Sequence, residues 1–260
     1  MIGFLNTNVP DPVAFSVFGI DIMWYGILIA IAILTAVCVC YRRAPKHGIP
    51  AERVFDAMIF CLPAGIIGAR LYYVAFNWSE YSGDFFMIIN LRLGGLAIHG
   101  ALIAGFLAGL IFCRAKGIKP LDGFDVAAPC IAIAQSIGRW GNYFNSEAHG
   151  GPTDLPWGIP AGAGGELVHP TFLYESVWCL ILFFVLIFID NRRYFMGQTF
   201  LSYGALYSVE RFFVEGLRTD SLMLGPLKQA RLLSAAVFFI SVAALGFLGR
   251  RAWKRKRIFY

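Results

Sequence analysis

The chain has 260 residues, of which 58% are hydrophobic and only 15% are charged, with a formal net charge of +6. Soluble domains are roughly half apolar and about a quarter charged, so this composition excludes an ordinary soluble domain and favours an integral membrane protein. The first eleven residues contain no lysine or arginine. A cleavable signal peptide, which begins with a basic segment, is therefore not expected.

Seven apolar runs follow one another along the chain, and a transmembrane helix needs about 20 such residues. They lie at about 16–40, 54–76, 96–113, 122–137, 171–189, 198–217 and 230–249. Residues 138–170 contain eight glycines and four prolines, which predicts a small outer loop or cap rather than a span. The pattern predicts an all-α protein with about seven transmembrane helices, folded as one polytopic membrane domain over residues 1–260.

The basic residues define an expected topology. Fifteen of the 22 lysines and arginines lie in the segments that follow the first, third, fifth and seventh runs. Because cytoplasmic loops are enriched in lysine and arginine, these segments are expected inside, with the N-terminus outside and the C-terminus cytoplasmic. The basic C-terminal tail is then a topology determinant beside anionic lipid, and no nucleic-acid partner is expected.

The remaining seven basic residues fall in outer loops or in the outer halves of the predicted spans, against the charge bias. Charged side chains within a membrane are costly and usually functional, which makes Arg70 and Arg211 candidate site residues. Two simpler interpretations remain open. Arg211 could only form an ion pair with Glu215 one turn further on. The long side chain of Arg70 could simply extend to the interface.

Other groups in the same predicted outer layer can move protons. His99 begins the third span, and histidine exchanges protons near neutral pH; a structural bond to a carbonyl is the alternative. Tyr207 lies one turn before Arg211 and shares its helix face. Tyr25 lies in the outer part of the first span, where an aromatic residue could equally be an interfacial anchor. Glu175 lies at the outer end of the fifth span.

The densest polar segment is the run from Gly138 to Gly150, which contains Arg139, Asn142, Asn145 and Glu147. Arginine binds phosphate through a planar, bidentate fork. The commonest phosphate at this depth is a phospholipid head group, so an enzyme acting on lipid head groups is a plausible class. A transporter or flippase and a helix-bundle receptor are the alternatives. The six cysteines fit no metal or disulfide spacing, and neither a metal nor another cofactor is expected.

Taken together, the motifs closely resemble those of the prolipoprotein diacylglyceryl transferase family, in the family's order over nearly the whole chain. The segments that carry the resemblance are the run 138–150, Trp24-Tyr25-Gly26, Gly68-Ala69-Arg70, Gly94-Gly95 with His99-Gly100, the run 169–175, Tyr207 through Arg211 with Glu215, and Arg218-Thr219-Asp220. Tyr143, Phe172 and Ala101 depart from the family pattern, at positions peripheral to the charged ones.

The resemblance implies a reaction in which the diacylglyceryl group of phosphatidylglycerol moves to the lipobox cysteine thiol of a preprolipoprotein. A thioether forms and glycerol phosphate leaves, as the first step of lipoprotein maturation. The implied partners are phosphatidylglycerol, the lipobox region of the preprolipoprotein signal peptide and the lipid bilayer. The implied location is the bacterial cytoplasmic (inner) membrane, which the chain crosses several times.

Chemistry then suggests roles for the site residues. A thiol has a pKa of about 8.5 and must lose its proton to attack carbon well; His99 is the candidate base, with Tyr207 or Tyr25 as alternatives. Arg139 and Arg211 are expected to hold the leaving phosphate, and Asn142 to orient the head group. The carboxylates of Glu147, Glu175 and Glu215 are expected to position the arginines. The predicted substrate site also includes Arg70, Asn145 and Arg218.

Overall fold

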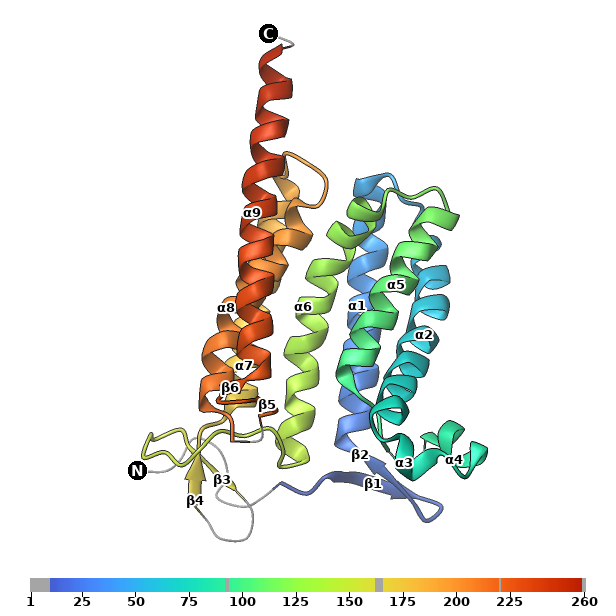
Figure 1. Ribbon diagram of the computed structural model, residues 1–260, viewed down its shortest axis with the longest axis vertical. Coiled ribbons are helices and arrows are strands. Elements are labelled where there is room, and N and C mark those ends of the chain that lie inside the picture. Colours follow the sequence, from blue (N-terminus) through green and yellow to red (C-terminus); the bar gives the residue numbers. More distant parts are fainter. Residues whose placement is uncertain (1–9, 92–93, 162–165, 220, 259–260) are drawn as a thin grey trace. The chain divides into compact units, whose positions relative to one another are not determined.

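A computed structural model describes residues 10–91, 94–161, 166–219 and 221–258. The described part consists mainly of helices, with short two-stranded hairpins between some of them (Figure 1). The helices are α1 (Trp24–Arg43), η1 (Ala44–His47), α2 (Arg53–Phe76), α3 (Trp78–Tyr81), α4 (Phe85–Ile89), α5 (Ile98–Ala115), α6 (Pro120–Phe144), α7 (Thr171–Asn191), α8 (Gln198–Leu217) and α9 (Gln229–Ile258). The antiparallel hairpins are β1 (Val13–Val17) with β2 (Ile20–Met23), β3 (Ile159–Ala161) with β4 (Glu166–Val168), and β5 (Met223–Leu224) with β6 (Leu227–Lys228).

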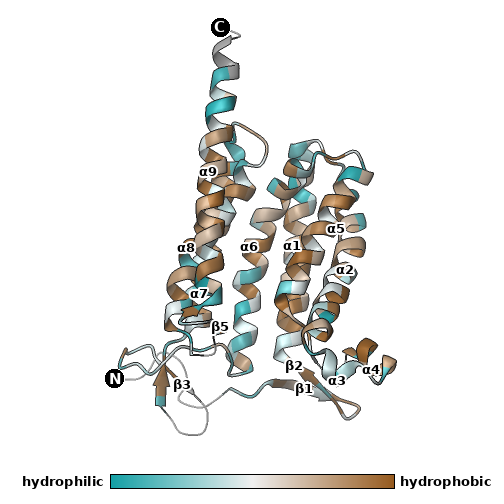
Figure 2. Cartoon of the chain, in the orientation of Figure 1, coloured by the Kyte–Doolittle hydropathy of each residue, from teal (hydrophilic) through white to brown (hydrophobic). Residues whose placement is uncertain are grey.

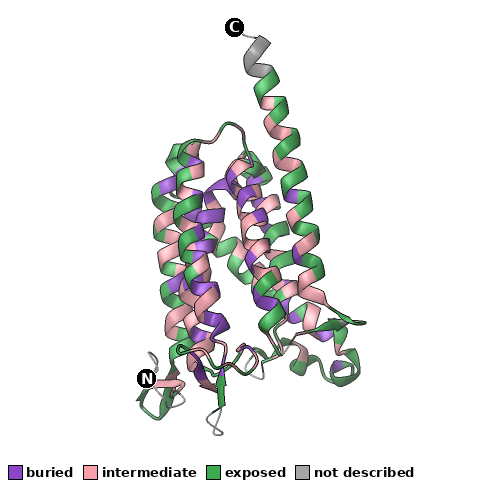
Figure 3. Ribbon diagram, turned by 90° about the vertical axis from the view of Figure 1, so that its left-hand side faces the viewer, coloured by how far each residue is buried: buried purple, intermediate pink, exposed green. Residues whose placement is uncertain are grey.

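Five helices of the described chain are long and apolar enough to cross a membrane: those at α1, α2, α5, α7 and α9. They are brown along most of their length in Figure 2, whereas α6 carries several hydrophilic positions. Much of the surface of α9 is exposed in Figure 3, as expected for a helix that meets lipid rather than protein. Helices α6 and α8 coincide with the two other predicted transmembrane spans, 122–137 and 198–217, but carry more polar residues. The fold is thus that of an all-α membrane protein.

Two predicted boundaries were wrong. The first span does not begin at residue 16, because Phe18 and Gly19 adopt positive φ angles of 50° and 77° and turn β1 into β2. Such φ angles are typical of a tight hairpin turn, so the helix begins only at Trp24. The outer loop does not begin at residue 138, because α6 continues to Phe144.

Close helix contact explains why α6 runs on through glycines. A Cβ atom on Gly141 would lie 2.6 Å from the ring of Tyr25, so only glycine lets α1 and α6 approach here. Trp24 stacks on Phe144 at the same end, with ring centroids 5.0 Å apart. The first half of the segment 138–150 is therefore helical, and it packs against α1 at Gly141 and Phe144.

The chain divides into two compact units, one formed by residues 40–126 and the other by residues 1–39 together with 127–260. In the unit 40–126, α2 packs tightly on α5. A Cβ on Gly68 would lie 2.8 Å from the carbonyl oxygen of Gly100, and it would also collide with Ala104. Glycine on both helices is what permits this close approach of the two backbones.

In the other unit, α6, α7 and α8 surround a small core. Ala132, Leu182 and Leu186 are its buried centre, and the rings of Tyr203 and Tyr207 pack against it. Helices α6 and α7 are also joined by two serines: the Ser136 hydroxyl donates to the carbonyl of Ser176 at 2.9 Å, and the Ser176 hydroxyl donates to the carbonyl of Ser136 at 2.8 Å. These bonds fix the helices on either side of the site.

Candidate active site

The centre of the site is the carboxylate of Glu175 on α7, whose side chain is 1% exposed. Arg139 of α6 forms an ion pair with one of its oxygens, without hydrogen-bond geometry. Arg211 of α8 lies 3.2 Å from the other oxygen, and Arg218, just after α8, lies 3.8 Å from it. Three arginines from separate parts of the sequence thus converge on one buried carboxylate. Arg139, Arg211, Arg218 and Glu175 are called the arginine cluster below.

Arg211 makes a second contact, with Glu215 one turn further along α8 at 2.5 Å. The predicted i,i+4 pair is therefore present, but it does not account for Arg211 alone, because the guanidinium also donates to Glu175. The side chains of Arg211 and Arg218 remain 19% and 13% exposed, so their guanidinium groups are not sealed off from a ligand.

Guanidinium groups are concentrated at this point of the fold. Among the described residues, three of them contact the two carboxylates of Glu175 and Glu215. Glu210 of α8 is 6% exposed and lies within the electrostatic reach of Arg139 and Arg211, yet neither of its oxygens has a hydrogen-bond partner among the described residues. Guanidinium groups that stay partly exposed, as those of Arg211 and Arg218 do, are chemically suited to contact an anion.

Aromatic hydroxyls line the inner side of the cluster. Arg139 donates to the hydroxyl of Tyr207 at 3.5 Å. The Tyr207 ring stacks on Tyr203 with centroids 5.5 Å apart, and the Tyr203 hydroxyl donates to Gln135 of α6 at 2.9 Å. Tyr207 therefore contacts Arg139, a neighbour that its position one turn before Arg211 did not indicate.

Several side chains that the sequence did not single out hold this cluster in place. Trp140 donates from its indole nitrogen to the Ser176 hydroxyl at 3.1 Å, which ties the neighbours of Arg139 and Glu175 together. The ammonium of Lys228, on β6, donates to the carbonyls of Glu215, Gly216 and Arg218 at 2.8, 3.3 and 2.6 Å. The last carbonyls of a helix have no partner within it, so Lys228 caps α8. No local sequence pattern indicates such a contact across ten residues or more.

The polar residues after α6 form a compact loop. Glu147 accepts hydrogen bonds from the side-chain amides of Asn142 at 2.9 Å and Asn145 at 3.5 Å. Ser146 and Ala148 adopt positive φ angles of 51° and 57°, which are uncommon for residues other than glycine. Asn142 follows Arg139 by three residues on α6 and shares its face. The three predicted polar residues therefore lie together where α6 ends, and their described bonds join them to one another.

The described contacts of Tyr25, Arg70 and His99 are with residues other than the arginine cluster. Tyr25 is 38% exposed in the first turn of α1, with its ring against Gly141 of α6. Arg70 and His99 belong to the unit 40–126. The guanidinium of Arg70 bonds backbone carbonyls of the segment 87–95. The His99 ring lies 6.1 Å from that of Tyr72.

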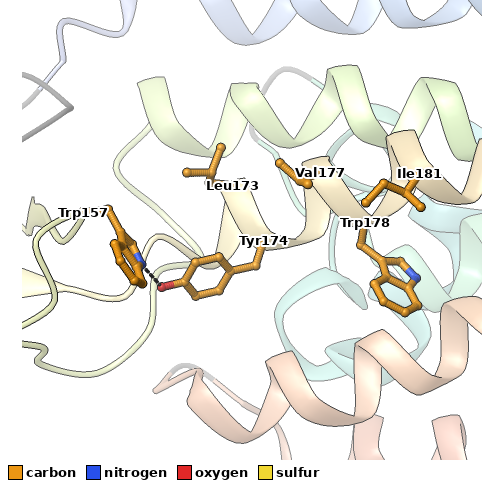
Figure 4. A pocket seen from close by; sticks show the side chains of 6 residues that line it. All are labelled: Trp157, Leu173, Tyr174, Val177, Trp178 and Ile181. Atoms are coloured by element: carbon orange, nitrogen blue, oxygen red, sulfur yellow. Dashed lines mark hydrogen bonds between the residues drawn. The ribbon is translucent and has the colours of Figure 1, made fainter.

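A separate apolar hollow of about 340 Å³ lies along α7 (Figure 4). It is lined by Trp157, Leu173, Tyr174, Val177, Trp178 and Ile181. The indole of Trp157 donates to the Tyr174 hydroxyl at 2.9 Å, which closes one end of the hollow. No charged side chain lines it, so it suits hydrocarbon rather than a head group. Within the described residues, no group of three His, Cys, Asp or Glu side chains is placed to hold a metal ion.

The apolar helices define this chain as a membrane protein, and the arginine cluster around Glu175 is its candidate active site. A family model of prolipoprotein diacylglyceryl transferases matches residues 12–247. The chain is 50% identical over 224 residues to the phosphatidylglycerol--prolipoprotein diacylglyceryl transferase of Clostridioides difficile, covering 86% of this chain and 90% of that protein.

Proteins with the same name from Finegoldia magna and Staphylococcus aureus are 46% and 42% identical, over 89% and 92% of this chain and 93% and 89% of their own lengths. The chain therefore belongs to the prolipoprotein diacylglyceryl transferase family. The resemblance read from its motifs is confirmed.

Proposed function

We propose that this protein transfers the diacylglyceryl group of phosphatidylglycerol to the lipobox cysteine thiol of preprolipoproteins. The thiol sulfur forms a bond to the glyceryl carbon, the bond from that carbon to the phosphate oxygen breaks, and the electron pair leaves with the phosphate. Glycerol phosphate is released and the thiol proton passes to a base. The observation that carries the proposal is the convergence of three arginines on the buried carboxylate of Glu175.

The arginine cluster fits the charge change of this reaction. A phosphodiester carries one negative charge, and the departing phosphate gains a second as the carbon–oxygen bond breaks. Guanidinium groups already fixed by Glu175 and Glu215 need not reorganise to stabilise that charge. Arg139 and Arg211 are therefore assigned to the phosphate, with Arg218 beside them, and Glu175 and Glu215 hold the guanidinium groups.

The neighbouring polar residues are assigned to the head group. Asn142, Asn145 and Glu147 follow Arg139 closely and present amide and carboxylate groups that can bond the hydroxyls of a glycerol head group. Tyr25 lies against the same helix at Gly141.

The proposed topology has seven spans, with α6 and α8 crossing beside the five more apolar helices. The basic segments that follow α1, α5, α7 and α9 would face the cytoplasm of a bacterium, and the N-terminus would lie outside the cytoplasmic membrane. The arginine cluster then faces outward, where a secreted preprolipoprotein presents its cysteine.

One incubation separates transfer from transport. The purified protein is mixed with phosphatidylglycerol labelled in the glyceryl backbone and with a peptide containing a lipobox cysteine. We expect label on the peptide that survives hydroxylamine, because a thioether is stable to it, and no label on a matched peptide with serine in place of cysteine. Label that crosses the bilayer without becoming attached to the peptide would identify a lipid carrier instead.

The identity of the base is tested by His99→Gln. We expect a lower rate of transfer and a flatter dependence of kcat on pH near neutrality, because a histidine side chain can exchange protons near neutral pH. The measurement is kcat against pH for wild type and variant. An unchanged profile would transfer the role to Tyr207, which contacts Arg139, or to Tyr25.

A further inference from the structure

Arg70 on α2 is the most completely bonded arginine side chain for which the structure gives contacts. It is 3% exposed, and its guanidinium lies 5.0 Å from the centroid of the Tyr81 ring. It donates to the carbonyls of Met87 at 2.5 Å, Ile88 at 2.8 Å, Gly94 at 2.7 Å and Gly95 at 3.1 Å. A guanidinium has five N–H donors, so few remain for a phosphate.

These acceptors are carbonyls that would otherwise be difficult to satisfy. Helix α4 has only five residues, so its last carbonyls have no partner within the helix. Its side chains are apolar and outward-facing, with Phe85, Phe86 and Ile89 being 68%, 75% and 56% exposed. In a lipid environment such backbone groups must be bonded internally. Arg70 supplies these bonds to α4 and to the glycine turn that follows it.

The glycine turn is shaped around the guanidinium. Gly94 and Gly95 have φ angles of +76° and +73°, which favour glycine. A Cβ on Gly95 would lie 2.6 Å from Nη1 of Arg70. Two residues later, the amide of Ala97 donates to the carbonyl of Ala69 at 3.1 Å, next to Arg70 on α2. The turn therefore has one tight conformation, set by α2.

This turn determines where α5 begins. Helix α5 starts at Ile98, directly after Ala97, so its first turn contains His99. The His99 ring lies near Tyr72 of α2, and Gly100 touches the α2 backbone at Gly68. The positions of the α5 N-terminus and of His99 thus both depend on the segment that Arg70 holds.

We propose that Arg70 is a positioning residue for the transfer reaction: it fixes the Gly94–Gly95 turn and thereby the placement of His99, and it does not bind the lipid phosphate. This inference rests on the proposed function only in assigning a role to His99. It replaces the substrate-binding role that the sequence alone suggested for Arg70.

The test compares Arg70→Lys with Arg139→Lys in the full-length protein. Lysine keeps the positive charge, but one ammonium with three donors cannot satisfy four carbonyls in two segments. For Arg70→Lys we expect kcat to fall about tenfold or more while KM for phosphatidylglycerol stays within about twofold, because the substrate contacts remain. Arg139→Lys is expected to raise KM for phosphatidylglycerol.

Amide hydrogen exchange provides a second readout that does not depend on activity. In Arg70→Lys, peptides covering residues 87–97 should exchange about tenfold faster, while peptides from α6 to α8 keep their protection. A rise in KM with unchanged exchange at 87–97 would assign Arg70 to the head group and overturn the proposal. Wild-type kinetics would overturn it too. If wild type itself transfers no label, the proposed function fails, and the exchange result still decides whether Arg70 fixes the turn.

A second variant, Tyr81→Leu, tests the same proposal independently if Arg70→Lys does not fold. Tyr81→Leu removes the ring beneath the guanidinium but leaves all four carbonyl acceptors in place. We expect the same pattern at smaller size, with kcat lowered, KM unchanged and faster exchange at 87–97. Unchanged exchange and kcat in Tyr81→Leu would contradict the role given to this segment.

Discussion

Arg139 and Arg70 are both arginines in long helices of a membrane protein, yet their surroundings differ in every respect. Arg139 shares the carboxylate of Glu175 with two other arginines, and its side chain is 21% exposed. Arg70 is 3% exposed, and within the described part of the chain its guanidinium bonds backbone carbonyls and lies over an aromatic ring. The first environment leaves guanidinium groups partly exposed beside carboxylates, whereas the second engages four of the five N–H donors of Arg70.

The comparison indicates that the role of an arginine in a membrane protein depends on the acceptor groups that its guanidinium bonds. Carboxylates hold a guanidinium at one side and leave other N–H groups free to meet an anion. Carbonyls from several directions enclose it. The contrast predicts that substitutions in the arginine cluster lower both the stability of the protein and its transfer activity. Substitutions around Arg70 are expected to lower activity by loosening the backbone of the segment that it bonds.

The largest effect is expected for Glu175→Ala. Removing the shared carboxylate leaves buried guanidinium groups without their counter-charge, which typically costs about 3–5 kcal/mol of unfolding free energy. Transfer activity should be lost as well. Thermal unfolding in detergent and the transfer assay measure both, with the exposed residue change Glu166→Ala as the matched control. A stable, active Glu175→Ala protein would contradict the role of Glu175 as the shared counter-charge of the three arginines.

Arg139→Ala should slow transfer by about 10²–10³-fold, the usual cost of removing one fixed donor to a developing negative charge. Stability should change less than in Glu175→Ala, because Arg211 and Arg218 still pair with the carboxylate. The transfer rate at saturating peptide is the measurement. Near-wild-type turnover would remove Arg139 from the phosphate site.

Lys228→Met tests whether the end of α8 matters for the cluster. Loss of a charged donor to the carbonyls of Glu215 and Arg218 should lower the unfolding free energy by about 1.5–3 kcal/mol. Transfer should fall several-fold as Arg218 shifts. Lys116→Met, at an exposed position after α5, is the control for removing one positive charge. Equal effects of the two variants would contradict the capping role.

The smallest effect is expected for Glu210→Met. Because the Glu210 carboxyl has no hydrogen-bond partner among the described residues, replacing it with an apolar side chain of similar length should leave stability unchanged or raise it by about 1 kcal/mol. Thermal unfolding gives the result. A variant that is equally stable but inactive would show that Glu210 contacts substrate, and it would enlarge the site.

Helix positions were largely readable from the sequence, since long apolar runs have few alternatives. The errors arose where a local turn overrode hydropathy. Residues 16–23 are apolar enough to continue a span, but the positive φ angles at Phe18 and Gly19 make them a hairpin. Gly138 and Gly141 suggested a loop, but in a helix they allow contact with α1. Glycine has both uses, and only the neighbouring element decides between them.

For the candidate site too, some features could be predicted from the sequence and others could not. The sequence by itself determined the residue types: Arg139, Glu175, Arg211 and Arg218 stand in motifs specific enough to indicate the family. Only the tertiary structure decided that Glu175 is the shared partner of the three arginines, that Lys228 caps α8, and that Arg70 is enclosed by carbonyls. Each of these contacts joins residues that are 10 to 43 positions apart in the sequence. Such contacts are set by how the elements pack together, which no local pattern encodes.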